Sequence, residues 1–377
     1  MKFSARKNRG QAQGIMLIVL ALAMLALFIL TTLVVTAFAK LETSLGNEWY
    51  QRGVNDLRGG NAEQAVIDLR SALSYSREES YRLELARALV AAGRTPEARE
   101  YLLSLWERQP GSAELNLELA RVSAISQAVP AAIGYYDAAI YGAWDAAPEL
   151  NRRNTRLELA RFLVERKDKR RALAVLYTVV SDLPPDPQIR TDVGTLLLQA
   201  GDARNARQVF EAALATTRNY VPALEGAGEA ALATNDFPAA EHYLAEYLRE
   251  SPDDQKAVSL LATARTALAL DPLQQHINAA ERRKRAIKLF NDAQQRVAQC
   301  VATLGGAFPP ADLQTASTNL AAQAQKATES ALRSDPDLVD DVFAASVNAV
   351  VASSKDCGPR HPMDDAINAL AQLHGVR

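Results

Sequence analysis

Three arginines recur at nearly constant spacing and in the same local context. Each ends a Leu-Glu-Leu-Ala-Arg phrase, and the phrases begin at Leu83, Leu117 and Leu157, which are 34 and 40 residues apart. In a helix, Arg87, Arg121 and Arg161 each follow a glutamate by three residues, a spacing that favours local ion pairs. A guanidinium group can also bind the carboxylate of another molecule through two parallel hydrogen bonds. Both interpretations remain open at this point.

The two cysteines, Cys300 and Cys357, are the other candidates for chemistry. A redox enzyme would place a Cys-x-x-Cys pair in the chain, and there is none. We expect either a structural disulfide, if this part of the chain lies in an oxidising compartment, or two free buried thiols. The four histidines lack zinc-site spacing, and no phosphate-binding glycine loop or Gly-x-Ser-x-Gly nucleophile motif occurs. The sequence therefore predicts no cofactor, no metal site and no enzyme.

Small residues recur with the same period as the arginines. Positions that we call anchors are followed twelve residues later by alanine in every case. The anchors are Gly53, Ala86, Ala120, Ala160, Gly194 and Gly228, and the alanines are Ala65, Ala98, Ala132, Ala172, Ala206 and Ala240. Two helices can approach closely where both carry small residues, so each pair of positions predicts a helical hairpin. A hairpin of this kind cannot bury its apolar face alone, and neighbours must stack.

Glycine and proline mark the ends of these predicted helices. Gly60, Gly93 and Gly201 lie seven residues after their anchors, where a helix can end in the left-handed conformation. Three prolines lie ten residues after theirs, in the first turn of the following helix; they are Pro96, Pro130 and Pro238. The larger residues Leu69, Tyr136 and Phe210 are expected to fill the space between hairpins. The 40-residue step predicts a lengthened turn or helix around residues 144–154.

This pattern resembles the tetratricopeptide repeat family over residues 45–252, with six repeats and a half repeat that extends to residue 270. The resemblance is carried by Trp49 with Gly53 and Gly60, and by Gly194 with Gly201, Ala206 and Phe210. Individual repeats depart from it, for example at Leu105 and Trp144. It implies an all-α superhelical solenoid whose concave groove binds a protein or peptide. It also places Arg87, Arg121 and Arg161 on or near the groove wall, where they would suit a carboxylate-bearing peptide.

The N-terminal region predicts a membrane segment. No charged residue occurs from residue 10 to residue 39, and a helix over residues 15–39 would be ~37 Å long, enough to cross a hydrocarbon core of ~30 Å. Ala37-Phe38-Ala39 also has the form of a signal-peptidase site, so cleavage after Ala39 is the alternative to an uncleaved anchor. Lys2, Arg6, Lys7 and Arg9 precede the segment, which predicts a cytoplasmic tail at residues 1–14 and a periplasmic or extracytoplasmic main body.

Residues 271–377 predict an all-helical cap for the end of the array. We expect helices at 275–304, 311–333 and 336–353 and a short one from residue 364. A break at Gly305-Gly306-Ala307 and a loop with Gly358, Pro359 and Pro362 interrupt them. The basic run from Arg282 to Arg285 either meets anionic lipid or an acidic partner, or is the solvated face of a helix.

Charge and composition narrow the function. The formal net charge of -2 disfavours a nucleic-acid binder. The leading hypothesis is a single-pass inner-membrane scaffold or adaptor that binds proteins at the periplasmic face. The alternatives are a chaperone-like holder of exported proteins and an enzyme whose site lies in residues 271–377.

Overall fold

The computed structural model describes residues 4–304, 308–357 and 363–376, with side chains from residue 16 onward except residue 18. In this part of the chain every regular element is an α-helix, and the predicted all-α class is confirmed. The chain divides into two compact units, residues 1–159 and 160–377. The predicted break at residues 305–307 and loop at residues 358–362 lie outside the described residues.

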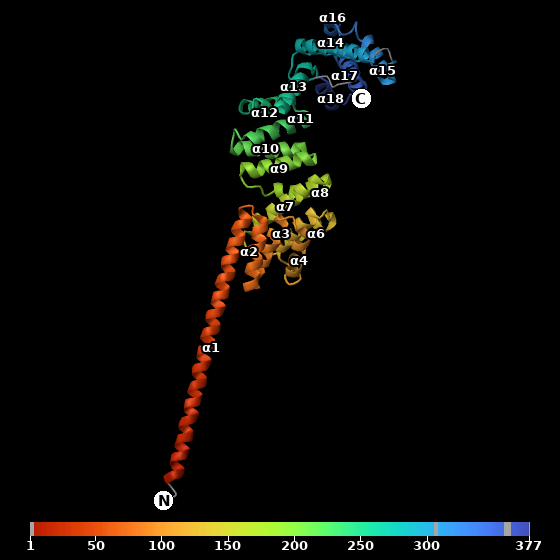
Figure 1. The fold of residues 1–377 in the computed structure, drawn as a ribbon. Coiled ribbons are helices and arrows are strands. Elements are labelled where there is room, and N and C mark those ends of the chain that lie inside the picture. Colours follow the sequence, from red (N-terminus) through yellow and green to blue (C-terminus); the bar gives the residue numbers. More distant parts are fainter. Residues whose placement is uncertain (1–3, 305–307, 358–362, 377) are drawn as a thin grey trace. The chain divides into compact units, whose positions relative to one another are not determined.

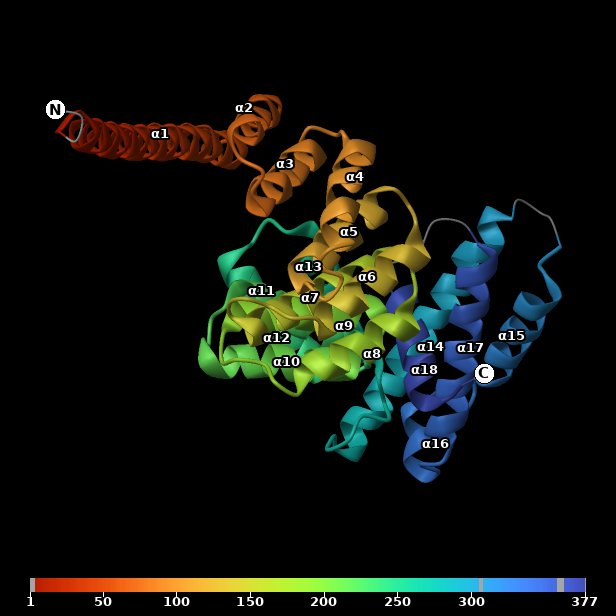
Figure 2. The same cartoon turned by 90° about the horizontal axis from the view of Figure 1, so that it is seen from below.

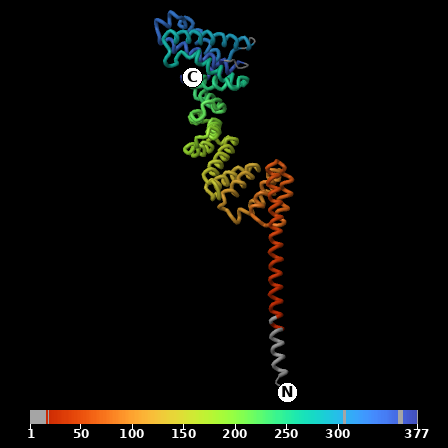
Figure 3. Tube along the Cα trace, turned by 90° about the vertical axis from the view of Figure 1, so that its left-hand side faces the viewer, coloured from red at the N-terminus to blue at the C-terminus, as the bar shows by residue number. Residues whose placement is uncertain are grey.

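The first unit begins with one unbroken helix, α1 (Ser4–Arg58), which is drawn in red in Figure 1; the red tube of Figure 3 shows its later part. The apolar segment and the first helix of the first repeat are therefore continuous. Met16 to Phe38 have exposed side chains wherever they are described, so this segment is not a core helix. By length and composition α1 can cross a membrane, and a signal sequence meets the same criteria.

Helical hairpins make up the rest of the first unit. The pairs are α1 with α2 (Ala62–Tyr75), α3 (Glu79–Ala91) with α4 (Thr95–Trp106), and α5 (Ala113–Ile125) with α6 (Val129–Tyr141). Each second helix also packs on the first helix of the next pair, α2 on α3 and α4 on α5, as Figure 2 shows. Helix α7 (Pro148–Glu165) follows and crosses the boundary between the units; its 18 residues, against 13 in α3 and α5, take up the 40-residue step.

In the second unit, hairpins continue and a helical module follows. The repeat helices are α8 (Lys169–Val180), α9 (Pro187–Ala200), α10 (Ala203–Thr216), α11 (Val221–Ala233), α12 (Phe237–Glu250) and α13 (Gln255–Leu270). The module contains α14 (Ala279–Thr303), α15 (Ala311–Ala322), α16 (Glu329–Ser334), α17 (Leu338–Asp356) and α18 (Asp364–His374). A single helix over 311–333 was expected; the structure has two, because the chain leaves the helix between residues 323 and 328.

Close packing explains the periodic small residues. All six anchors and all six alanines twelve positions later are buried. A Cβ on Gly194 would lie 2.7 Å from the Phe210 ring, and one on Gly53 would lie 2.6 Å from the Leu69 side chain. Atoms do not approach this closely, so only a residue without a side chain fits at these crossings.

Helix ends follow the same period. The residue seven after each anchor has a positive φ in all six repeats, although only three of these residues are glycine. They are Gly60, Gly93, Gln127, Lys167, Gly201 and Asn235, with φ between 57° and 95°. Aspartates then cap the next helices of the second unit: the carboxylates of Asp168, Asp202 and Asp236 accept hydrogen bonds from backbone N–H groups of the first turn.

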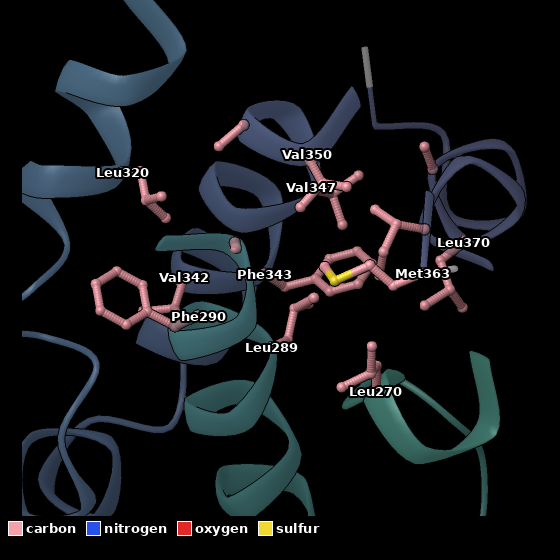
Figure 4. Close-up of a cluster of buried hydrophobic side chains, with 14 of the residues drawn as sticks. Leu270, Leu289, Phe290, Leu320, Val342, Phe343, Val347, Val350, Met363 and Leu370 are labelled. Atoms are coloured by element: carbon pink, nitrogen blue, oxygen red, sulfur yellow. The ribbon is translucent and has the colours of Figure 1, made fainter. Parts of the chain in front are cut away.

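The C-terminal module has its own apolar core, which includes the end of α13. Leu270, Leu289, Leu320, Phe343 and Leu370 come from five different helices and are at most 3% exposed (Figure 4). Helix α17 packs against α14, α15, α16 and α18. The module is therefore organised around α17.

Candidate functional site: a charged face of the repeats and a paired C-terminal module

Arg87 lies at the centre of a charged network in the first unit. Its Nη1 contacts Oε1 of Glu84, one turn earlier in α3, at 2.6 Å. Its Nη2 contacts Oε1 of Glu114 at 2.6 Å, and its Nε contacts Oε1 of Glu118 at 2.8 Å; both glutamates belong to α5 in the next repeat. One guanidinium group therefore makes the local ion pair that the sequence suggested and also bridges two repeats.

Arg121 extends the network in the same direction. Its Nη1 contacts Glu118 at 3.2 Å, again the local pair. Its Nε and Nη2 each donate to one oxygen of Glu158 in α7, both at 2.8 Å, and the Tyr136 hydroxyl donates to Glu158 at 3.0 Å. Because Glu118 accepts from both arginines, the ion pairs link α3, α5 and α7.

Burial strengthens these contacts. The side chain of Glu118 is only 9% exposed, and those of Arg87 and Arg121 are 30% and 42% exposed. Burial lowers the pKa of Arg87, but Glu118, Glu114 and Glu84 outweigh that effect and raise it. Two guanidinium groups face four carboxylates, so the positive charge of Arg87 and Arg121 is already compensated within the protein.

Arg161 differs from the other two arginines. It lies in the second unit near the end of α7, and its side chain is exposed. Across residues 4–304, 308–357 and 363–376, no acidic group forms an ion pair with it. Of the three arginines singled out in the sequence, the structure brings Arg87 and Arg121 together in one network and leaves Arg161 available to solvent.

Sequence reasoning missed two members of the network, Glu114 and the Tyr136 hydroxyl. Glu114 precedes Glu118 by four residues on the same face of α5, and this spacing was a signal that could have found it. Tyr136 was expected only to fill space between repeats. It does so at 3% exposure, and its hydroxyl also reaches Glu158.

Family comparison agrees with the hairpin geometry. Two tetratricopeptide repeat profiles match the chain, one over residues 83–149 and the other over residues 197–264. The chain contains tetratricopeptide repeats. Such repeats bind peptides or proteins and are usually non-catalytic, and no enzyme family was found. No curated protein matches the chain.

Solved structures also match part of the chain at low sequence identity. PilW, described as a widely conserved type IV pilus biogenesis factor, is 20% identical, with 57% of this chain and 98% of PilW covered and a TM-score of 0.45. YrrB, described as having an unusual peptide-binding site, is 17% identical, with 50% and 95% covered and a TM-score of 0.41. PilF of Pseudomonas aeruginosa is 19% identical, with 60% and 86% covered and a TM-score of 0.35.

Beyond the tetratricopeptide repeats, a disulfide joins α14 to the end of α17. Cys300 and Cys357 have Cα atoms 5.2 Å apart and are 0% and 4% exposed. Beside them, Arg296 binds both carboxylate oxygens of Asp364 at 3.0 Å, and its Nη2 donates to the Cys357 carbonyl at 3.3 Å. The disulfide and this buried ion pair together hold α14, α17 and α18.

The basic run in α14 is used for contacts between helices. Arg282 contacts Asp340 and Arg283 contacts Glu329, each at 2.9 Å, while Arg285 pairs with Glu281 in its own helix. Lys284 remains 77% exposed. The run therefore ties α14 to α16 and α17 more than it offers charge to solvent.

The part of the chain that the structure describes holds no group of three or more His, Cys, Asp or Glu residues suited to a metal ion. It does contain open cavities. One of about 670 Å³ lies between α1 and the start of α3 in the first unit. Another of about 570 Å³ lies in the second unit beside Asp271 and His374, whose side chains are 3.1 Å apart.

Proposed function

We propose that this protein is a membrane-anchored scaffold whose tetratricopeptide repeats hold another protein at the outer face of the cytoplasmic membrane. The observation that carries the proposal is α1, in which an exposed apolar segment continues directly into the first repeat. An exposed apolar surface of this size is stable in a lipid bilayer and costly in water.

Two observations support the orientation. Basic residues precede the apolar segment, which favours a cytoplasmic N-terminus. The Cys300–Cys357 disulfide is typical of an oxidising compartment outside the cytoplasm. In this proposal residues 1–14 are the cytoplasmic tail, residues 15–39 span the membrane, residues 45–270 form the repeats and residues 271–377 cap the array in the periplasm.

In this proposal Arg87 and Arg121 have a structural role, and Arg161 has a role in binding the partner. Arg87 and Arg121 keep neighbouring repeats in register through shared carboxylates, because their hydrogen bonds are already made within the protein. Arg161 contacts the partner, because its charge is exposed and has no acidic partner among the described residues. The partner segment at this position carries a carboxylate, which a guanidinium group binds with directional hydrogen bonds.

Site-specific photo-crosslinking in native membranes tests the scaffold. A photoreactive residue in place of Glu165, which is exposed one turn after Arg161 in α7, leaves the arginine intact and is expected to give one discrete cross-linked protein. The same residue in place of Tyr141, which is 82% exposed on α6, is expected to give none. Equal labelling at both positions, or a broad smear of many clients at residue 165, contradicts a scaffold with a fixed partner.

A matched pair of substitutions tests the arginine. Arg161→Ala is expected to lose the partner in a pull-down, and Arg170→Ala, at an exposed position in α8, is expected to keep it. Topology is checked separately by adding protease outside spheroplasts. Protection of residues 45–377 until the cells are lysed contradicts the orientation.

A further inference from the structure

The cavity between α1 and α3 combines two unpaired charges with an aromatic wall. Its lining includes Lys40 on α1 and Glu78 immediately before α3. Neither side chain forms an ion pair with the other, or with any other charge in the described part of the chain. A cation and an anion that share one cavity without neutralising each other suit a ligand that carries both signs of charge.

Two tyrosines and several small polar residues complete the lining. The rings of Tyr50 and Tyr81 stack at 4.5 Å with an interplanar angle of 15°. Burial, and then Glu84 for Tyr50 and Glu78 for Tyr81, raise the pKa of both hydroxyls, so both stay protonated and can donate hydrogen bonds at neutral pH. A half-buried tyrosine face can also attract an ammonium group. Asn47 adds an amide that can both donate and accept hydrogen bonds.

Position narrows the ligand further. Lys40 directly follows the apolar segment, and the polar headgroup layer adds roughly 5–7 Å on each side of a ~30 Å hydrocarbon core. The edge of the cavity nearest the apolar segment, at Lys40, therefore falls within the headgroup layer when that segment spans the bilayer. Asn47 lies ~10 Å further along the helix, at 1.5 Å per residue. The acyl chains of a bound lipid would then run beside the exposed apolar residues of α1.

We infer that this cavity binds the headgroup of a zwitterionic phospholipid. Lys40, at the level of the headgroup layer, binds the phosphate, and Glu78 with the tyrosine face binds the ammonium group, which lies further from the acyl chains. The inference rests on the membrane anchoring proposed above. An anionic lipid fits less well, because Glu78 would repel a headgroup that has no positive charge to offset the repulsion.

Native mass spectrometry of the full-length protein in detergent, titrated with defined lipids, tests the site. Phosphatidylethanolamine is expected to bind at least several-fold more tightly than phosphatidylglycerol. Lys40→Ala and Glu78→Gln should each weaken phosphatidylethanolamine binding about tenfold, because each removes one charge-assisted contact to the headgroup. Glu48→Gln is the matched control, because Glu48 lies on α1 outside the cavity lining. Equal binding of both lipids, or unchanged binding by Lys40→Ala and Glu78→Gln, overturns the inference.

Two further measurements separate the lipid from other ligands. Free phosphoethanolamine at the lipid's concentration should not compete, because it lacks the acyl chains; full competition shows a soluble zwitterion instead. A photoreactive residue at Asn47 should label lipid, and labelling of a polypeptide identifies the cavity as a protein contact and overturns the inference.

Alkaline carbonate extraction of wild-type membranes tests the anchor independently. A protein that resists extraction but shows no headgroup preference refutes the lipid site alone, and a protein that is extracted refutes the proposed anchoring.

Discussion

Arg87 donates from Nε to Oε1 of Glu118 across the boundary between two repeats, at 2.8 Å. The acceptor is 9% exposed and lies 31 residues further along the chain. Stacked repeats contact only their neighbours, so their stability depends on interfaces of this kind. The charged face of the first unit is therefore part of how the array holds together.

Removing Arg87 is expected to weaken the array more than removing an exposed arginine. In Arg87→Ala the largely buried Glu118 keeps only one of its two arginine partners, Arg121. The free energy of unfolding should therefore fall by about 2 kcal/mol. Arg108 pairs with Glu79, and the arginine side chain is 60% exposed. Arg108→Ala should therefore lower the free energy of unfolding by at most about 1 kcal/mol. Urea unfolding followed by circular dichroism measures both. Similar losses for the two variants would show that the network adds nothing beyond a surface pair.

Glycine substitutions at the left-handed helix ends are expected to stabilise the protein. Gln127 and Lys167 have φ near 60°, where a residue with a Cβ is about 1 kcal/mol less favourable than glycine. Gln127→Gly and Lys167→Gly should each raise stability by roughly 0.5–1 kcal/mol, visible as a higher Tm. Gly93→Ala is the reverse control. A Cβ there meets nothing within 4 Å, so its destabilisation would be conformational alone, and a neutral Gly93→Ala would refute the argument.

Gly226 is expected to tolerate no side chain while Phe210 is present. A Cβ on Gly226 would lie 2.3 Å from the Phe210 ring, so Gly226→Ala should destabilise the second unit by about 1–3 kcal/mol through overpacking. Shortening the neighbour in Gly226→Ala/Phe210→Leu should restore part of that loss. A thermal-denaturation double-mutant cycle gives the coupling between the two positions. Additive effects would mean that the clash is relieved elsewhere.

Asp364 is expected to be essential for the C-terminal module. Its side chain is 0% exposed, and Asp364→Asn leaves the Arg296 charge buried without its counter-ion, which should cost about 3 kcal/mol. Asp312→Asn is the matched control, because Asp312 pairs with Lys355 and both side chains are more than two-thirds exposed. This substitution should change the stability of the module little. Hydrogen exchange at α17 and α18 reports the loss locally. Unchanged protection in Asp364→Asn would contradict a structural role for the pair.

The repeat period predicted most of the solenoid because packing restricts residue size. Only a small residue fits where Gly194 meets Phe210, so the chemistry of the contact is visible in the sequence. The left-handed conformation of Gln127 and Lys167 was not visible, because their residue types do not indicate it; only their position, seven residues after an anchor, is shared with the glycines. The division of the 311–333 segment into two helices was missed because no glycine or proline marks it between residues 323 and 328.

Partner choice among charged residues could not be predicted in the same way. Arg121 has one glutamate a turn away in its own helix, Glu118, and another in the next repeat, Glu158, and both offer a carboxylate. Only the stacking of the helices determines that Arg121 donates two hydrogen bonds to Glu158. The proximity of Lys40 and Glu78 was also hidden, since it depends on how α3 packs beside α1.

The continuity of α1 has a mechanical consequence. Helix α1 joins the apolar segment to the first hairpin without a break between Ser4 and Arg58, and it contains no proline at which it would kink sharply. With the apolar part held in a bilayer, tilting or rotating that part therefore also turns the first hairpin. The anchor then acts as a lever that sets how the first repeats face the membrane surface, and a bound lipid or neighbouring helix that changes its tilt would change what those repeats can reach.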